Sequence, residues 1–134
     1  MTVTEPYVAL YLTHEAADPE EVTAVMGVTP TTSGRAGDTI LYPEYASVHP
    51  QSSWVLRSRL KGVYEATPHL YDLFEQLEPD WSAVVAISKK WDAVMLCSIS
   101  CDSYDRAIHL SPDMMSRIAA LDADLQIRIY APSD

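Results

Sequence analysis

Apolar and polar residues alternate along several stretches of the chain, which is the pattern of β-strands with one buried face. The most regular alternation begins at residue 54, where Trp54, Leu56 and Leu60 fall on one side of the expected strand. The other side carries Val55 and three basic residues, Arg57, Arg59 and Lys61. The same reasoning predicts strands over residues 6–14, 39–45, 54–61, 91–101 and 125–130.

Three segments with apolar residues at helical spacing predict helices. Each begins with a residue that favours helix N-caps, followed by proline at the first helical position: Asp18-Pro19, Thr67-Pro68 and Ser111-Pro112. Glu21 stands three residues after Asp18, as in a capping box, and Gly27 suits the end of the first helix. The apolar run 81–87 after Pro79 fits either a further helical turn or a strand.

The resulting order is strand, helix, strand, strand, helix, strand, helix, strand. We therefore expect an α+β two-layer sandwich, with a ferredoxin-like βαββαβ core and an added αβ unit. Its helices would cover one face of a mostly antiparallel sheet, and the other face would be open to solvent. No repeat, low-complexity segment or linker interrupts the sequence, so residues 1–134 are expected to form a single domain.

Four segments occur in a characteristic order along nearly the whole chain: DPEEVTAVMGVTPTTSGRAGD, SSWVLRS, LYDLFEQLEPDW and IHLSPDMMSRIAALDADLQIRIY. Their pattern resembles a bacterial family, domain of unknown function 4279. The resemblance implies a small bacterial protein without an established activity, and relatives near toxin systems suggest an immunity-type role. Such sequences often have a glycine after the third helix. Here Leu121-Asp122-Ala123-Asp124 predicts a left-handed Asp or a different turn.

Charge limits the partners that the protein can bind. The chain has 19 acidic and 9 basic residues, for a net charge of −10. A field of this sign repels nucleic acids and anionic membranes, and it favours a basic protein partner. The N-terminal sequence MTVTEPYVAL lacks the basic start and apolar run of a signal peptide. No apolar run approaches the roughly 20 residues that span a bilayer. We expect a cytoplasmic protein.

The loop of residues 28–38 contains glycines, hydroxyl side chains and an arginine, as phosphate-binding loops do. A P-loop, however, needs a lysine after its second glycine and leads directly into a helix. Here Asp38 follows Gly37, and a strand is expected next. The loop is therefore predicted to connect a helix to a strand, with Arg35 able to reach a carboxylate.

The histidines and cysteines do not predict a metal or cofactor site. His49 and His69 are expected at the surface, and in the weak His14-Glu15-Asp18 cluster the need for a helix cap already explains Asp18. Cys97 and Cys101 lie about 13 Å apart along the expected strand. Because a disulfide needs α-carbons within about 7 Å, both are predicted to be buried thiols.

The outward face of the predicted sheet carries the residue types that are most enriched at binding hot spots. Strand parity places on it Tyr7, Tyr11, Arg57, Arg59, Lys61, Arg128 and Tyr130. We therefore expect a non-catalytic binding protein that recognises a protein or a small anionic ligand, with neutralisation of a basic toxin as the most concrete version. An ordinary solvated face, with pairs formed across strands, is the alternative interpretation.

Two further hypotheses stay open. The first is an enzyme with its site around the Asp102–His109 loop, built from Asp102, Asp105, His14 and His109. It predicts a deep pocket and a strongly perturbed titration. A polar loop is a poor place for the desolvated carboxylate that a general acid requires, so this hypothesis comes second. The other is a homodimer formed by pairing edge strands, with the sheet face buried between the subunits.

Overall fold

The computed structural model describes residues 5–41, 46–100 and 107–130. Its strands are β1 (Tyr7–His14), β2 (Thr32–Gly34), β3 (Thr39–Leu41), β4 (Ala46–Val48), β5 (Ser52–Arg57), β6 (Asp92–Ser100) and β7 (Ala123–Tyr130). The α-helices are α1 (Pro19–Met26), α2 (Ala66–Leu77), α3 (Trp81–Ser88) and α4 (Pro112–Ala120), and a short 3-10 helix, η1 (Glu78–Asp80), joins α2 to α3. The predicted α+β class is confirmed.

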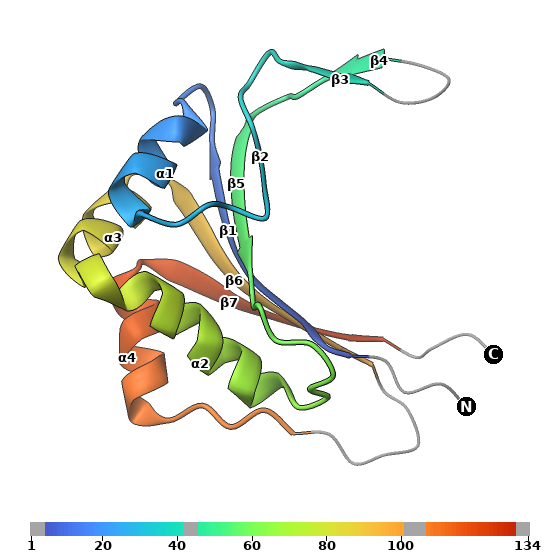
Figure 1. Ribbon diagram of the computed structural model, residues 1–134, viewed down its shortest axis with the longest axis vertical. Coiled ribbons are helices and arrows are strands. Elements are labelled where there is room, and N and C mark those ends of the chain that lie inside the picture. Colours follow the sequence, from blue (N-terminus) through green and yellow to red (C-terminus); the bar gives the residue numbers. More distant parts are fainter. Residues whose placement is uncertain (1–4, 42–45, 101–106, 131–134) are drawn as a thin grey trace.

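The main sheet has the strand order β2-β5-β1-β6-β7. Its neighbours are antiparallel except for β6 and β7, which are parallel and are connected through α4. All the helices lie on one face of this sheet (Figure 1), so the two-layer arrangement is confirmed. The order β6-β1-β5-β2 is that of the predicted ferredoxin-like βαββαβ core, in which the first strand lies antiparallel between the third and the fourth, so this prediction is confirmed. The added αβ unit provides the parallel pair.

The core lies between the sheet and the helices and follows the predicted parity. Val8, Leu10 and Leu12 of β1 face the helices and are almost completely buried. From α2 the predicted stripe reaches them, with Leu70, Leu73, Phe74 and Leu77. Trp54 of β5 is fully buried, and its indole N–H donates a hydrogen bond to Thr23 Oγ1 in α1 at 3.1 Å. This bond gives the buried indole N–H of Trp54 a hydrogen-bond partner in the core.

Two of the three predicted helix starts are confirmed. The side chain of Asp18 accepts a hydrogen bond from the Glu20 N–H at 3.0 Å, and that of Ser111 accepts one from the Met114 N–H at 3.1 Å. The third prediction is wrong, because α2 begins at Ala66, before Thr67. The hydroxyl of Thr67 accepts instead from the His109 N–H at 2.8 Å, a contact between distant segments that local sequence does not reveal.

Two helix ends use left-handed backbone conformations, as the sequence predicts. Gly27 ends α1 with a φ of 70°, and its N–H donates to the Thr23 carbonyl. After α4, Asp122 has a φ of 55° and donates its N–H to the Ala119 carbonyl at 3.0 Å. Asp122 therefore takes the position where glycine would be less strained, which is the first of the two predicted alternatives.

The region between α1 and β5 departs most from the predicted elements. The expected strand 39–45 is observed as β3 over Thr39–Leu41, which pairs with β4 in a separate two-stranded sheet. β4 lies outside the predicted strands, and β2 lies within the loop 28–38. Arg35 of that loop does reach a carboxylate, with its guanidinium 3.6 Å from Asp18.

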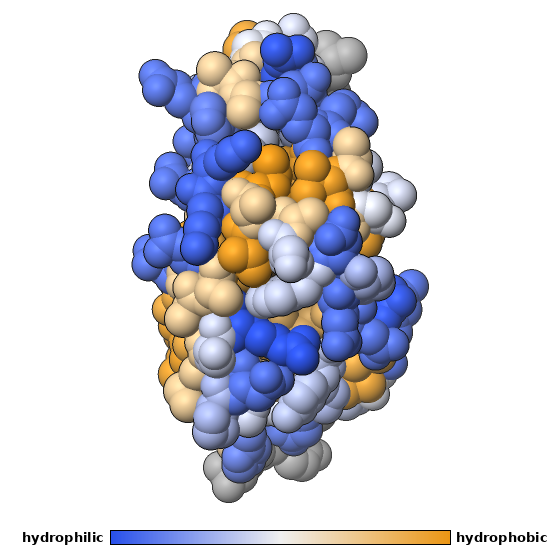
Figure 2. Space-filling model, turned by 90° about the vertical axis from the view of Figure 1, so that its left-hand side faces the viewer, coloured by the Kyte–Doolittle hydropathy of each residue, from blue (hydrophilic) through white to orange (hydrophobic). Residues whose placement is uncertain are grey.

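The run 81–87 forms α3, the helical one of its two alternatives. On the helix side of the molecule, Figure 2 shows an apolar area at the height of α1 and α3, surrounded by hydrophilic side chains. Val25 and Val85 are partly buried residues of these two helices and pack against the core. Within the described residues, every helix is too short or too polar to cross a bilayer.

Candidate functional site

A pocket of about 430 Å³ lies where β5 ends and the chain turns toward α2. Its walls come from the segment at the start of β1, the loop after α1, the turn of residues 58–61 and the facing side of α2. The polar side chains of its lining are Glu5, Thr29, Thr31, Arg57, Ser58, Arg59, Lys61, His69 and Gln76. Three of the chain's 9 basic residues thus gather at one pocket of an acidic protein.

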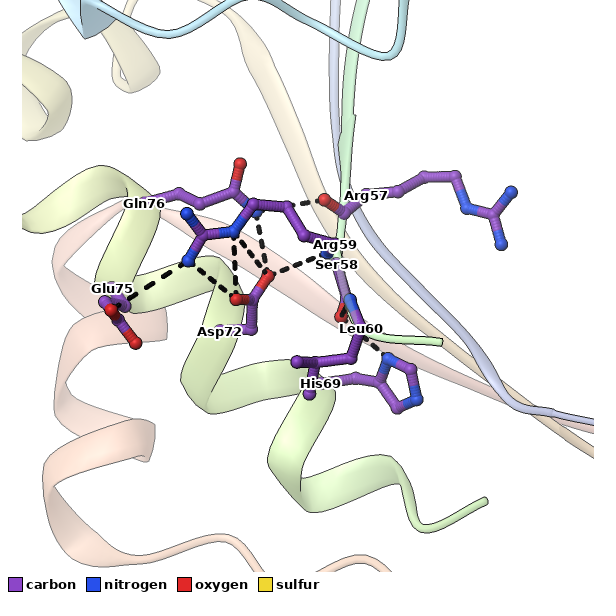
Figure 3. A network of polar contacts seen from close by, with 8 residues as sticks. All are labelled: Arg57, Ser58, Arg59, Leu60, His69, Asp72, Glu75 and Gln76. Carbon is purple, nitrogen blue, oxygen red and sulfur yellow. Dashed lines mark hydrogen bonds and ion pairs between the residues drawn. The ribbon is translucent and has the colours of Figure 1, made fainter. Parts of the chain in front are cut away.

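The three basic residues of the pocket do not share one face of the sheet. Arg57, the last residue of β5, points away from α2, whereas Arg59 turns back toward that helix (Figure 3). The prediction that Arg59 lies on the open face is therefore wrong. Because β5 ends at Arg57, strand parity does not extend to Arg59 or to Lys61.

Asp72 of α2 is the partner that turns Arg59 toward the helix. It accepts hydrogen bonds from the Arg59 backbone N–H at 2.8 Å, from Nε at 3.0 Å and from a terminal guanidinium nitrogen at 2.7 Å. Burial alone would raise the pKa of Asp72, but these bonds and the charge of Arg59 outweigh it and hold the pKa below its usual value. The Arg59 side chain therefore attaches the end of β5 to α2.

Gln76 completes this attachment one helical turn further along α2. Its side-chain N–H groups donate to Asp72 at 3.0 Å and to the backbone carbonyl of Arg57 at 3.1 Å. Glu75 adds a longer ion pair to Arg59, at 3.9 Å. The polar residues of α2 therefore satisfy the backbone that β5 leaves unpaired where its strand ends.

His69 lies at the base of the pocket and is almost completely buried, with 3% of its surface exposed. The prediction of a surface histidine is wrong, because the turn after β5 folds over the first turns of α2. The imidazole Nε2 lies 2.8 Å from the Val63 carbonyl, which can only accept, so Nε2 carries the proton. Nδ1 then accepts from the Ser58 hydroxyl at 2.7 Å. Both ring nitrogens are used to hold the turn that carries Arg59 and Lys61.

The turn that follows Lys61 binds a carboxylate of the chain itself. The backbone N–H groups of Gly62 and Val63 both donate to Glu5 Oε1. Gly62 has a φ of 71°, in the left-handed region that favours glycine. Successive backbone amides in such a turn form a small anion-binding site. Lys61 stands next to it and forms no ion pair with the described residues.

The remaining predicted binding residues lie on the open face of the sheet. The hydroxyls of Tyr7 and Tyr11 are 2.8 Å apart, and the guanidinium of Arg57 lies 4.3 Å from the centre of the Tyr7 ring. Burial, followed by the Tyr11 hydrogen bond, raises the pKa of Tyr7 to about 12. The register places Arg128 of β7 across β6 from Tyr7, through Ser98.

A second, shallower hollow of about 310 Å³ lies on this open face. Tyr11 and Arg128 line it together with Thr13, Val94, Leu96 and Gln126. Tyr130 is 41% exposed at the end of β7, opposite Ser100 of β6. The predicted set is therefore divided: Tyr7, Tyr11, Arg57, Arg128 and Tyr130 share the open face, while Arg59 and Lys61 belong to the pocket alone.

The two described residues of the enzyme hypothesis, His14 and His109, are not brought together. His14 ends β1, where its Nδ1 accepts from the Ala16 and Ala17 N–H groups and its ring lies 5.3 Å from that of Trp91. His109 contacts the start of α2, at the opposite end of the sheet (Figure 1). Asp102 and Asp105 lie outside the described residues. No group of metal-binding side chains is found within the described ranges.

Cys97 is buried in the core, and burial raises the pKa of its thiol to about 11. This agrees with the predicted buried thiol, while Cys101 lies outside the described residues. A thiol with so high a pKa is poorly nucleophilic at neutral pH. Cys97 is a core residue and contributes nothing to the pocket.

Sequence reasoning missed the polar residues that α2 contributes. His69, Asp72 and Gln76 follow one another at intervals of three and four residues, so they lie on one side of the helix. That spacing predicts a polar stripe along the helix, beside its apolar stripe. Glu5 carried no comparable signal, because its partners Gly62 and Val63 are far away in the sequence.

The comparisons with known proteins identify the family. The model of the family described as Domain of unknown function (DUF4279) matches residues 4–132, and the chain belongs to this family. No curated protein and no solved structure matches the chain. The description of the family names no activity, so the function has to be inferred from the pocket and its surroundings.

Proposed function

We propose that this member of the DUF4279 family is a non-catalytic binding protein whose pocket at the end of β5 takes an anionic group of its ligand. The observation that carries the proposal is the gathering of Arg57, Arg59 and Lys61 around one pocket in a protein with a net charge of −10. A local basic site within an acidic surface attracts an anion to one place only. The volume of about 430 Å³ is within the usual range for small-ligand sites.

The roles of the basic residues in this proposal differ. Lys61 and Arg57 supply the charge that meets the ligand, since neither has a carboxylate partner among the described residues. The planar guanidinium of Arg57 is suited to binding a carboxylate or phosphate with two hydrogen bonds. Thr29 and Ser58 add hydroxyl groups to the wall. Arg59 acts as a positioning residue, because Asp72 engages its side chain.

A binding role is favoured over catalysis by the state of His69. A general base needs a free acceptor that a substrate proton can reach. Both ring nitrogens of His69 instead make short hydrogen bonds within the protein, at 2.7 and 2.8 Å. The Ser58–His69 pair also lacks a carboxylate to orient the imidazole, since a backbone carbonyl takes that place.

Titration of the protein with inorganic phosphate, citrate and a short acidic peptide tests the proposal, with binding followed by calorimetry and NMR shifts. We expect binding of at least one probe, with the largest shifts at Ser58 and Lys61. Arg57→Gln and Lys61→Met should each weaken it by roughly tenfold, the loss of one charge-assisted contact. Lys89→Met, which removes an exposed lysine at the end of α3, should have no effect. Binding that is unchanged in the two pocket variants would refute the proposal.

A second candidate is neutralisation of a basic protein, such as a toxin, in the cytoplasm of a bacterium. The net charge of −10 supports it, as do exposed carboxylates such as Glu75, which is 77% exposed. The reduced, buried thiol of Cys97 suits a reducing compartment. Affinity capture from cells that carry the neighbouring genes should recover a basic partner, and its release should depend on salt. Recovery of a partner that is acidic would contradict this second role.

A further inference from the structure

β7 forms one edge of the main sheet and has no strand on its outer side among the described residues. It is eight residues long and pairs with β6 in an unbroken parallel register from Ala123 to Tyr130. The opposite edge, β2, has only three residues. Proteins commonly protect sheet edges by keeping them short or by placing lysine, proline or a bulge in them. β2 is protected by its length, whereas β7 is long and contains no lysine, proline or bulge, and its only charged residues are Asp124 and Arg128.

The outer part of β7 also exposes large apolar side chains. Ile127 is 44% and Ile129 is 70% exposed, the latter being the largest exposed fraction among the large hydrophobic residues of the described ranges. Both point to the helix side, since their β6 neighbours are Cys97 and Ile99. An exposed, regular edge strand with an apolar row is a template for pairing with another strand.

We propose that β7 pairs with β7 of a second copy of this chain, antiparallel about a twofold axis at Gln126. In this register Asp124 lies opposite Arg128 of the second copy, and the same pair recurs by symmetry. Within the described residues, neither Asp124 nor Arg128 has an ion-pair partner in its own chain. Cross-strand neighbours of opposite charge stabilise an antiparallel pair. Charge complementarity therefore selects a second copy as the occupant of this edge.

The apolar residues fit the same register. On the helix side, Leu125 lies opposite Ile127 of the second copy, and Ala123 lies opposite Ile129. Both exposed isoleucines are then covered by side chains of the other molecule. An axis shifted by one residue, at Ile127, would place Asp124 opposite Tyr130 and Arg128 opposite Gln126, and the charge pairs would be lost. The Gln126 axis is thus the register that satisfies charge and apolar burial together.

The dimer would join the open faces of the two sheets into one surface. Gln126 and Arg128 of β7 line the hollow of about 310 Å³ on the open face. Gln126 lies on the proposed twofold axis, and Arg128 lies two residues from it. The two hollows would then meet at the interface, and the second copy would supply part of the wall of each. This inference does not depend on the anion-binding role of the pocket at the end of β5, which lies on the other side of β1.

Analytical ultracentrifugation from about 1 µM to about 1 mM, the range in which modest dimers dissociate, tests the inference. We expect a dimer whose dissociation constant rises by roughly tenfold or more in Ile129→Lys. Val48→Lys, at a 56% exposed position in β4, is the matched control and should leave it unchanged. A monomer at all concentrations, or a dimer indifferent to Ile129→Lys, would overturn the proposal.

Charge exchange tests the register itself. Asp124→Arg and Arg128→Asp should each weaken the dimer, because each brings like charges together across the axis. The double variant Asp124→Arg/Arg128→Asp restores opposite charges and should recover most of the lost affinity. Circular dichroism would verify that every variant is folded. Additive weakening in the double variant would show that the two residues do not face each other, and would refute the Gln126 axis.

A cross-link gives an independent measurement. Residues opposite each other in an antiparallel pair have α-carbons about 4.5–5.5 Å apart, which suits a disulfide. Gln126→Cys should therefore form a covalent dimer on mild oxidation, more than either the unsubstituted protein or Thr32→Cys on the other edge strand. Equal cross-linking of the two edge variants would contradict the pairing of β7 with β7.

Discussion

Asp72 receives both the backbone N–H and the guanidinium of Arg59, at 2.8 Å and 2.7 Å, and so binds the end of β5 to α2. Asp72 is nearly inaccessible, with 6% of its side chain exposed. Replacement by alanine would leave the partly buried backbone N–H of Arg59 without its acceptor. We expect Asp72→Ala to lower the free energy of unfolding by about 1–3 kcal/mol. Denaturant unfolding at neutral pH would measure the loss. Glu75→Ala, an exposed control on the same helix, should have little effect.

The Asp72 carboxylate should also make the free energy of unfolding depend on pH in the acidic range. The pKa of Asp72 is lower in the folded protein than its ordinary value of 3.8, so the unfolded chain binds a proton first as the pH falls. Its stabilising contribution is complete above that ordinary value and is lost as the pH falls through the folded pKa. Asp72→Asn should therefore show a flatter loss of stability below pH 3.8 than the unsubstituted protein. An equally steep loss in both would contradict the assignment.

Gly34 and His49 are coupled by close packing at the base of the β3–β4 hairpin. A Cβ atom at residue 34 would come within 2.5 Å of the His49 ring. Overpacking of this kind destabilises by about 1–3 kcal/mol, and we expect that penalty for Gly34→Ala. In a His49→Ala background the same change should be almost neutral. A double-mutant cycle by thermal unfolding measures the coupling, and additive effects would show that the His49 ring is not what opposes a side chain at residue 34.

Asp122 is left-handed at the end of α4, with a φ of 55°. A side chain in this conformation is strained relative to glycine by about 1 kcal/mol, less for Asp than for most residues. Asp122→Gly should therefore raise the free energy of unfolding slightly, and Asp122→Val should lower it clearly. Thermal unfolding of the three proteins tests this order. Destabilisation by glycine would mean that the side chain of Asp122 contributes more than its strain.

Tyr11 and Arg57 shift the pKa of Tyr7 in opposite directions, so variants of these two residues should have opposite effects on it. The pKa of Tyr7 is raised to about 12 by burial and by Tyr11, while Arg57 acts in the lowering direction. Tyr11→Phe should bring the pKa of Tyr7 back toward 10.0, and Arg57→Met should raise it further. NMR of ring-labelled tyrosine separates Tyr7 from the other tyrosines. Since the unfolded chain ionises first, stability should fall as the pH rises from 10 toward 12. Shifts of the same sign in both variants would refute the assignment.

The sequence was most informative where structure is decided locally. Asp18 and Ser111 cap helices through residues two or three positions away, and both starts were predicted. The alternation of Val8, Leu10 and Leu12 located the core face, because strand parity needs no knowledge of the partner strand. A left-handed Asp was one of the two alternatives predicted after the last helix, because the chain lacks a glycine there, and Asp122 adopts that conformation.

Predictions were wrong where a distant residue decides the outcome. Arg59 leaves the predicted face because of Asp72, thirteen positions further along the chain. β2 is a strand only because β5 offers it partners, and its own three residues show no alternation of apolar and polar side chains. The division of the predicted binding surface follows from the end of β5 at Arg57, which its own alternating pattern does not indicate.

The β3–β4 hairpin leaves the main sheet after β2 and returns to it at β5, and these two strands are direct neighbours. Two backbone bonds between its arms, Gly37 N–H to the His49 carbonyl and His49 N–H to the Asp38 carbonyl, close its base. The hairpin is therefore an appendage whose length can change without altering the order of the main strands. We expect evolution, or protein engineering, to lengthen, shorten or replace this arm freely while the layer of helices underneath stays the same.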